Sequence, residues 1–229
     1  GYGKTKDSLY EAWLSAAKQA GWPLTDDYNG SNSEGFGRSQ YTIRNGHRSS
    51  SANAHLRSAA KRKNLSIKTN TLTIKIIIEK KRAIGVKYLK KGEIGEAYAD
   101  NEIVVAGGTI NSPQILMLSG IGPAEHLREF GIDSIVDLPV GKNLQDHQVS
   151  DIAWERPDGN ASQFREEMRF DRMVSSMIRA YIFRSGPATV LPGGMHAFIK
   201  SSSELEVPDI EFMFRGAPLN AHLWFPCLK

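Results

Sequence analysis

Three small residues in the middle of the chain, Ala106, Gly107 and Gly108, have a setting that suits nucleotide binding. A strand-like run, 102–105, precedes them. Ser112 and Pro113 follow and predict a helix start, with the serine as N-cap and the proline at the first helical position. A strand that turns through small residues into a helix brings backbone N–H groups and the positive end of the helix dipole to one place. The turn is therefore predicted to lie beside a nucleotide.

The histidines are the next candidates for chemistry. Asp146 and His147 are neighbours on a predicted loop, 140–147. Neighbouring loop residues rarely point toward each other, so an ordinary hydrogen-bonded histidine is favoured over an active-site one. Structural roles are also favoured for His196 and His222. No serine with the context of a nucleophile is present, and no Cys/His/Asp cluster has metal-ligand spacing. The sequence thus predicts no catalytic residue and no metal site within this chain.

The elements that must position the turn can be predicted from apolar spacing and turn residues. Two basic runs, 61–63 and 80–82, flank strand-like segments, and the second is predicted to join two strands of a hairpin. The predicted strands are 39–43, 65–69, 72–79, 83–89, 134–137, 196–200 and 209–214. The predicted helices are 7–20, a short one within 47–62, the one ending at Ser119-Gly120, 124–130 and 164–181. Residues 26–37 are predicted to form a long loop, and the stripe Met173, Val174 and Met177 to face a core.

Composition restricts the class of protein. The chain has 229 residues, of which 40% are hydrophobic, so it can form one large domain or two modest ones. The formal net charge is +4, but the basic clusters lack interleaved aromatic residues, and no nucleic-acid partner is predicted. No apolar run approaches the roughly 18 residues of a membrane helix, so no membrane span is predicted.

The number of cysteines and the glycosylation sequons provide information about the cellular compartment of the protein. Cys227 is the only cysteine, which excludes an internal disulfide. The three Asn-x-Ser sequons, at Asn29, Asn64 and Asn160, favour a secreted parent only weakly. The chain starts with Gly1 rather than Met, so we expect its true N-terminus to lie upstream. The sequence leaves the oligomeric state open.

Five segments follow one another in an order that is typical of one family. They are 46–56 (GHRSSSANAHL), 64–75 (NLSIKTNTLTIK), 108–122 (GTINSPQILMLSGIG), 138–147 (LPVGKNLQDH) and 208–214 (PDIEFMF). Together they resemble the glucose–methanol–choline (GMC) oxidoreductases, which are FAD-dependent alcohol and sugar oxidases and dehydrogenases. The third resembles the second signature of the family, and the fourth its Gly-x-Asn-Leu-x-Asp-His loop. The last resembles insect members, which implies a glucose-dehydrogenase-like subtype.

The resemblance implies FAD as cofactor and assigns four contacts to it. The valine whose main chain meets the FAD adenine in the family corresponds to Thr73, and a β-branched threonine can serve because the contact uses backbone groups. Ala106, Gly107 and Gly108 supply the other three contacts. The implied fold class is a Rossmann-like α/β portion of an FAD-binding domain plus an α+β portion of a substrate domain. Residues 1–51 would be a cap or substrate-domain excursion, 52–150 part of the FAD-binding domain, and 151–229 part of the substrate-binding domain.

Two parts of the family pattern are absent from the chain. The Gly-x-Gly-x-x-Gly turn that cradles the FAD pyrophosphate has no convincing counterpart, and the catalytic histidine lies near the C-terminus of full-length members. We therefore expect an internal fragment that is inactive alone and binds FAD poorly. Its parent would oxidise a CH–OH group of a small-molecule alcohol or sugar by hydride transfer to flavin. A non-catalytic scaffold or binding protein is the alternative, and another flavoprotein such as a hydroxylase ranks lower.

Overall fold

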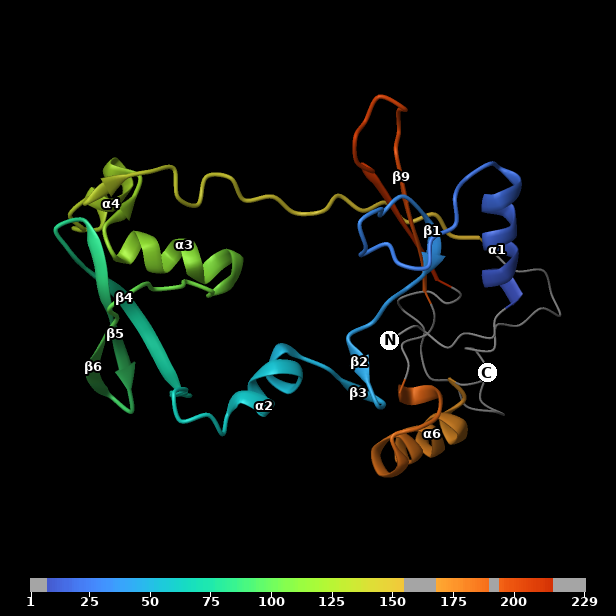
Figure 1. Ribbon diagram of the computed structural model, residues 1–229, viewed down its shortest axis with the longest axis horizontal. Coiled ribbons are helices and arrows are strands. Elements are labelled where there is room, and N and C mark those ends of the chain that lie inside the picture. Colours follow the sequence, from blue (N-terminus) through green and yellow to red (C-terminus); the bar gives the residue numbers. More distant parts are fainter. Residues whose placement is uncertain (1–7, 155–167, 190–193, 216–229) are drawn as a thin grey trace. The chain divides into compact units, whose positions relative to one another are not determined.

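The computed structural model describes residues 8–154, 168–189 and 194–215 (Figure 1). Its first elements are α1 (Ser8–Gln19), β1 (Gly35–Arg38), β2 (Ile43–Arg44), β3 (His47–Arg48), the π-helical turn η1 (Ala52–Leu56), α2 (Arg57–Ala59), β4 (Thr71–Glu79), β5 (Arg82–Lys90) and β6 (Glu93–Tyr98). The remaining elements are α3 (Gly108–Leu118), β7 (Ile121–Gly122), α4 (Ala124–Glu129), β8 (Val136–Asp137), α6 (Phe170–Phe183), the 3-10 turn η2 (Pro187–Thr189), β9 (Met195–Ile199) and β10 (Ile210–Phe214).

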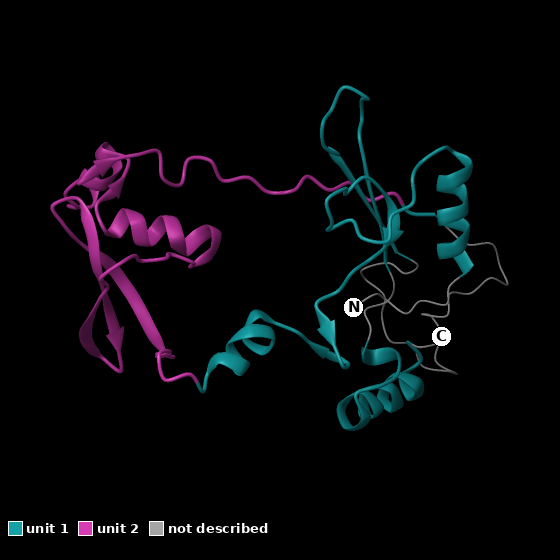
Figure 2. Cartoon of the chain, viewed as in Figure 1, with its two compact units in different colours: residues 1–61, 153–229 teal, residues 62–152 magenta. Residues whose placement is uncertain are grey.

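The chain divides into two compact units, which Figure 2 shows in different colours. Unit 1 comprises Gly1–Lys61 and Ala153–Lys229, and unit 2 comprises Arg62–Ile152. Unit 1 is thus discontinuous in sequence, whereas unit 2 is a single stretch. The three domain ranges inferred from the sequence remain a prediction about the domains of a whole protein.

Unit 1 is built on an antiparallel sheet in the order β1-β9-β10, with α1 against one face. The ring of Trp13 on α1 lies 4.7 Å from that of Phe36 on β1 and stacks 5.6 Å from that of Phe214 on β10. Met195 and Ala197 on the central strand are completely buried. Helical spacing correctly predicted α1, because its aromatic and apolar residues form the face that this sheet covers.

The strand predicted over 39–43 is wrong. The strand is Gly35–Arg38, which pairs with β9 and begins within the loop predicted over 26–37. A Cβ on Gly37 would stand 2.4 Å from the Thr25 carbonyl oxygen, so the glycine lets the preceding loop pack against the sheet. Glycines weaken the local strand signal, and a partner from far along the chain decides the pairing.

Unit 2 contains the antiparallel meander β4-β5-β6. Lys80 and Lys81 join β4 to β5 with positive φ angles of 47° and 65°, as a two-residue hairpin turn requires. The predicted strands 72–79 and 83–89 are thereby confirmed. The strand predicted over 65–69 is wrong, because these residues form no strand and pair with none of the strands in the described part of the chain.

The rest of unit 2 is α3, which lies beside β4 (Figure 1), followed by α4 and the short parallel pair β7 and β8. The predicted helix after Pro123 is confirmed as α4, and it ends before Gly131, which has a φ of 67°. Leu127 on α4 is 1% exposed and is the most deeply buried side chain of this unit.

The helix predicted over 164–181 corresponds to α6, while 164–167 lie outside the described residues. The prediction of a core stripe on it is wrong, since Val174 is 40% and Met177 60% exposed. Helical spacing identifies an apolar face, but it does not say which element covers that face. Nowhere in the described residues is a helix long and apolar enough to span a membrane.

Candidate nucleotide site

The predicted nucleotide turn lies at the head of α3. Gly107 is the N-cap residue, with φ −78° and ψ 0°, and Gly108 has a φ of 83°. A Cβ on Gly107 would stand 3.1 Å from Asn111 Cβ and 3.2 Å from Ser112 N, so this position favours glycine sterically. Gly108 has open space around it, but its positive φ favours glycine. Gly107 and Gly108, the first two residues of this turn, therefore leave their backbone uncovered by side chains.

The predicted start of this helix is wrong. Ser112 is not the N-cap, and Pro113 lies inside α3, which begins at Gly108. The two glycines allow the turn to close earlier, and Pro113 costs the helix one hydrogen bond because proline has no N–H. Gly107 makes no side-chain cap, so the first N–H groups of α3 can be offered to an acceptor outside the helix.

The strand predicted before the turn is also wrong. Residues 102–105 have no regular secondary structure, and Val104 is 77% exposed. An extended segment becomes a strand only when a neighbour pairs with its backbone, and none of the described strands does so.

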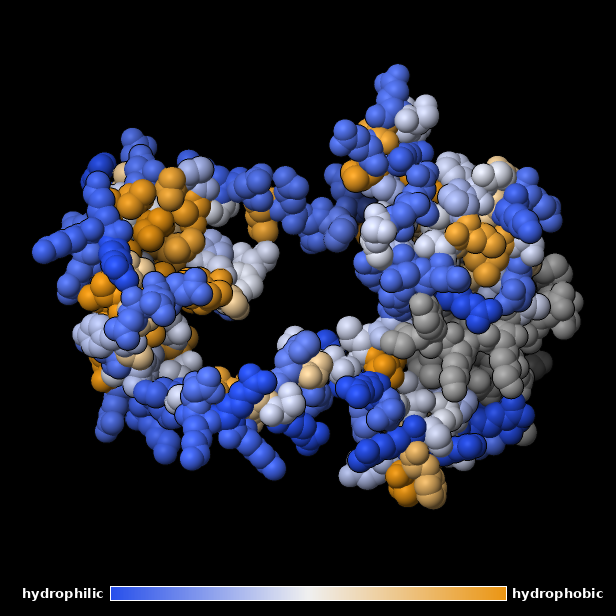
Figure 3. All heavy atoms as spheres, viewed as in Figure 1, coloured by the Kyte–Doolittle hydropathy of each residue, from blue (hydrophilic) through white to orange (hydrophobic). Residues whose placement is uncertain are grey.

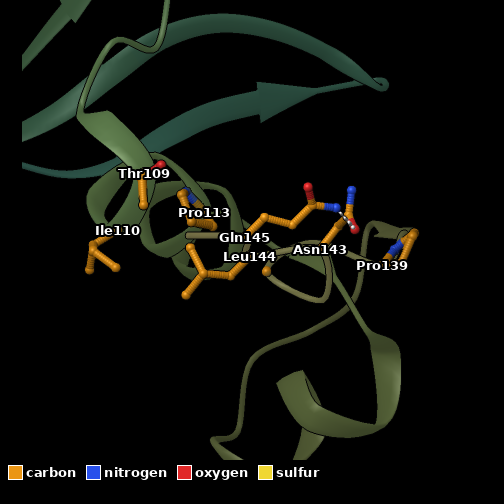
Figure 4. A pocket seen from close by; sticks show the side chains of 8 residues that line it. Thr109, Ile110, Pro113, Pro139, Asn143, Leu144 and Gln145 are labelled. Carbon is orange, nitrogen blue, oxygen red and sulfur yellow. Dashed lines mark hydrogen bonds between the residues drawn. The ribbon is translucent and has the colours of Figure 1, made fainter. Parts of the chain in front are cut away.

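A hollow of about 510 Å³ lies beside the first turns of α3 (Figure 4). Its walls are Thr109, Ile110 and Pro113 from α3 and Pro139, Gly141, Asn143, Leu144 and Gln145 from the loop after β8. Within that loop, Gln145 Nε2 donates to Asn143 Oδ1 at 3.3 Å. Two segments that are separated along the sequence, the head of α3 and the loop 138–147, thus form one concave surface.

The apolar side chains around the hollow remain exposed. Ile110 and Leu144, which line it, and Phe130 and Leu138 nearby in sequence are all exposed. Figure 3 shows apolar residues gathered on unit 2, in the part of the view where Figure 1 labels α3 and α4. The walls combine apolar side chains with a threonine and two amides. Such a hollow can take a ligand that carries both a flat ring and polar groups.

Residues 119–122 hold the loop in place relative to α3. The carbonyl of Gly120 accepts hydrogen bonds from the N–H groups of Ile135 and Val136, at 2.8 and 3.2 Å, and that of Gly122 accepts one from Leu138 at 3.2 Å. A Cβ on Gly120 would stand 2.7 Å from the Asp133 carbonyl oxygen. Glycine at position 120 permits the backbone of 119–122 to lie close to that of 133–138. This contact directs the chain into the loop that lines the hollow.

Ser119 connects α3 to the sheet. Its Oγ donates to the Ile115 carbonyl at 2.6 Å and accepts from the Ile76 N–H on β4 at 2.8 Å. Ser119 is 6% exposed, and its bond to Ile76 is buried. The local sequence predicts Ser119 only as a helix end, because it holds no signal for a partner 43 residues away.

Thr73 lies on β4, the edge strand of the meander, and pairs with Tyr88 on β5. The register shifts between Thr73 and Lys75, so the strand is irregular at Ile74. Thr73 belongs to the same unit as Ala106, Gly107 and Gly108, and α3 packs against β4. It is not among the residues that line the hollow, which begins at Thr109. Ala106, Gly107 and Gly108 are not among the lining residues either. The predicted contacts therefore lie on β4 and on the turn at the start of α3, outside the lining of the hollow.

The histidines do not form a catalytic pair within the described residues. The bond between Asp146 and His147 runs from the His147 backbone N–H to Asp146 Oδ1, at 2.8 Å, and does not involve the imidazole. His196 on β9 packs against the ring of Tyr28 at 5.2 Å, with Nδ1 3.6 Å from Glu211 Oε1. Burial lowers the pKa of His196 below its usual value. His222 and Cys227 lie outside the described residues.

No group of three or more His, Cys, Asp or Glu side chains that could hold a metal ion occurs in the part of the chain that the structure describes. The chemistry of the hollow is therefore that of backbone N–H groups, amides and apolar side chains. These groups bind and orient a ligand, and they do not supply a nucleophile or a base.

Known proteins share this sequence and fold. The GMC oxidoreductase family profile matches residues 2–149. Human mitochondrial choline dehydrogenase is 42% identical over 223 residues, which are 96% of this chain and 37% of the relative. The oxygen-dependent choline dehydrogenase of Brucella suis biovar 1 is 38% identical over 213 residues, or 93% of this chain and 38% of the relative. The chain thus spans less than two fifths of the length of these curated relatives.

Two solved structures resemble the fold. An FAD-dependent oxidoreductase from Chaetomium thermophilum superimposes with a TM-score of 0.68 at 27% identity, covering 86% of this chain and 35% of that one. A formate oxidase from Aspergillus oryzae, whose FAD modification has been studied, gives a TM-score of 0.68 at 26% identity with the same coverage. The predicted fold class, with a Rossmann-like portion of an FAD-binding domain, is confirmed, and FAD is the cofactor of this group. The family profile covers more than half of the chain, and the chain therefore belongs to the GMC oxidoreductase family.

Proposed function

We propose that this chain is part of an FAD-dependent enzyme that oxidises a CH–OH group of a small-molecule alcohol or sugar. The observation that carries the proposal is the hollow between the first turns of α3 and the loop 138–147, which follows directly on the glycine turn 107–108. The similarity to choline dehydrogenases supports alcohol oxidation. When bound, FAD supplies the hydride acceptor, and this chain supplies contacts that hold and orient it.

The residues present fit such a cofactor. A Cβ on Gly107 would be crowded by Asn111 and Ser112 of α3, so glycine fits this turn best, and without a side chain its backbone is open to a ligand. The helix dipole of α3 and its uncapped N–H groups favour a negatively charged or electron-rich group at the same place. Thr73 lies on an edge strand, whose outer backbone groups are available to recognise an adenine ring without using a side chain.

We further propose that the chain is an internal part of a longer enzyme. Residues 52–150 would belong to its FAD-binding domain, with 1–51 and 151–229 on the substrate side. The coverage of 37% and 38% of the relatives supports the proposal that the whole enzyme is longer than this chain. The motif 208–214 supports an insect glucose-dehydrogenase-like subtype, and the sequons at Asn29 and Asn64 support secretion. Alone, residues 1–229 would neither hold FAD tightly nor oxidise an alcohol.

The proposal can be tested on the longest natural chain that contains residues 1–229. After gel filtration, flavin absorbance should report about one FAD per chain, and anaerobic addition of the correct alcohol should bleach it. Choline, glucose and a simple aryl alcohol represent three substrate classes. A folded, flavin-free protein would instead support the non-catalytic scaffold. Bound flavin that no alcohol reduces would contradict the proposed reaction while leaving the cofactor in place.

The same measurement on residues 1–229 tests the proposal of an internal part. We expect this segment to elute without flavin, because the contacts it carries are those of Thr73 and the turn at the head of α3. A soluble segment with stoichiometric FAD would show that it binds the cofactor without further contacts.

A further inference from the structure

We infer that Ser119 is a positioning residue for the cofactor, because its hydroxyl fixes the strand that carries Thr73 against the helix that carries Gly107. The inference rests on the proposed function and assigns a role to a side chain that touches neither the hollow nor the predicted contacts. Ser119 lies at the opposite end of α3 from the nucleotide turn.

The hydroxyl of Ser119 both donates and accepts a hydrogen bond. It donates to the Ile115 carbonyl at 2.6 Å, which fixes its orientation, and its lone pair then accepts from the Ile76 N–H at 2.8 Å. Ser119 is buried, and so is Ile76. A buried N–H that loses its acceptor is strongly unfavourable, so removal of the hydroxyl would force β4 to move or water to enter.

The bond takes the place of a neighbouring strand. β4 is at the edge of its sheet, and β5 pairs with it on one side. On the other side, the Ile76 N–H would need water or another strand if Ser119 did not accept from it. The hydroxyl therefore anchors an otherwise unpaired strand edge to the end of α3.

Thr73 lies only three residues before Ile76, on the far side of the irregularity at Ile74. The backbones of the two residues are covalently joined over three positions, and the disrupted ladder between them leaves fewer hydrogen bonds to β5 to hold Thr73 in place. Movement of β4 at Ile76 would therefore shift the backbone of Thr73. The other predicted contacts lie at the start of α3. The bond from Ser119 to Ile76 therefore helps to set the separation between Thr73 and that turn.

The experiment uses the full natural chain as apoprotein and compares the wild type with Ser119→Ala and Ser119→Thr. AMP serves as a competitor that carries only the adenine half of FAD. Loss of the hydroxyl should lower the population of chains with β4 correctly placed, and the apparent dissociation constant rises in inverse proportion to that population. We expect Ser119→Ala to raise the dissociation constants of FAD and AMP by about tenfold. Ser119→Thr, which keeps a hydroxyl, should recover most of this loss.

Two further measurements separate positioning from general destabilisation. With FAD saturating, the rate of flavin reduction by alcohol in Ser119→Ala should equal that of the wild type. Asp137→Ala, which removes the Asp137 Oδ1 acceptor of the Ala124 N–H at 3.0 Å, is the matched control. It should lower the stability of unit 2 without changing the AMP affinity. If Ser119→Ala does not fold, Ser119→Cys replaces it, because sulfur accepts the bond only weakly.

Unchanged FAD and AMP affinities in Ser119→Ala would overturn the inference, as would an equal loss of AMP affinity in Asp137→Ala. A slowed reduction at saturating FAD would also overturn it, because the effect would then not be confined to the adenine side. A wild-type chain that binds no flavin would overturn the proposed function itself, and this inference with it.

Discussion

Gly37 on β1 lies so close to Thr25 that a Cβ on the glycine would stand 2.4 Å from the threonine carbonyl oxygen. The same segments are joined by hydrogen bonds from Thr25 N to Phe36 O and from Phe36 N to Pro23 O, each 2.9 Å long. The glycine therefore allows a loop to pack directly on the central sheet of unit 1.

Gly37→Ala should destabilise unit 1, because the atom in the way is backbone and the loop must move. We expect a loss of about 2 kcal/mol in the free energy of unfolding, measured by urea titration of the natural chain. Gly21→Ala is the comparison, since its Cβ would meet nothing within 4 Å and only its φ of 83° is unfavourable. It should cost about 1 kcal/mol. Equal losses in both variants would contradict the steric explanation.

Gly107→Val should weaken FAD binding, because the new side chain would collide with Asn111 and Ser112 and displace the start of α3. We expect the dissociation constant to rise at least about tenfold, since the N–H groups at the helix head would lose their alignment. Gly131→Ala, a glycine with positive φ and open space after α4, is the control. An FAD affinity in Gly107→Val equal to that of the control would refute the placement of the cofactor at this turn.

We propose that Thr73 contacts the adenine ring of FAD through its backbone, so its side chain should be replaceable without loss of FAD affinity. Thr73→Val should leave the FAD dissociation constant within about twofold, because valine has the same branched shape. Thr73→Pro removes the N–H and should raise the constant by about tenfold or more. Equilibrium titration of both apoproteins with FAD measures the contrast. A large effect of Thr73→Val would mean that the hydroxyl itself takes part.

His196 should make the stability of unit 1 dependent on pH. Burial is the main cause of its lowered pKa, the Glu211 carboxylate opposes that shift, and Arg215 adds to it. Because the folded-state pKa is below the unfolded value of about 6.5, the unfolded chain takes up the proton first. The contribution of neutral His196 is therefore present above pH 6.5 and is lost as the pH falls through the folded-state pKa.

Urea titrations of the natural chain between pH 5 and pH 8 measure this effect. The free energy of unfolding of the wild type should fall more steeply below pH 6.5 than that of His196→Gln, which cannot be protonated. Parallel curves for the two proteins would show that His196 is not the titrating group.

The sequence alone identified the elements whose signals are local. The hairpin of β4 and β5 follows from alternating β-branched residues around Lys80 and Lys81. α4 follows from Pro123 before it and Gly131 after it. These signals act over a few residues, and the order of the motifs was sufficient to indicate the family. That Ala106, Gly107 and Gly108 contact a nucleotide stays a prediction, while the structure shows that Gly108 has a φ of 83°.

Only the tertiary structure decided the features that depend on distant partners. β1 forms at Gly35–Arg38 because β9 pairs with it, although its glycines disfavour a strand locally. The segment 102–105 has suitable residues but is not a strand, since none of the described strands pairs with it. The hollow exists because hydrogen bonds to Gly120 and Gly122 direct the loop 138–147 to the head of α3, and Ser119 acquires its partner Ile76 in the same way. Backbone pairing and burial act between segments that the sequence separates, so local patterns cannot specify them.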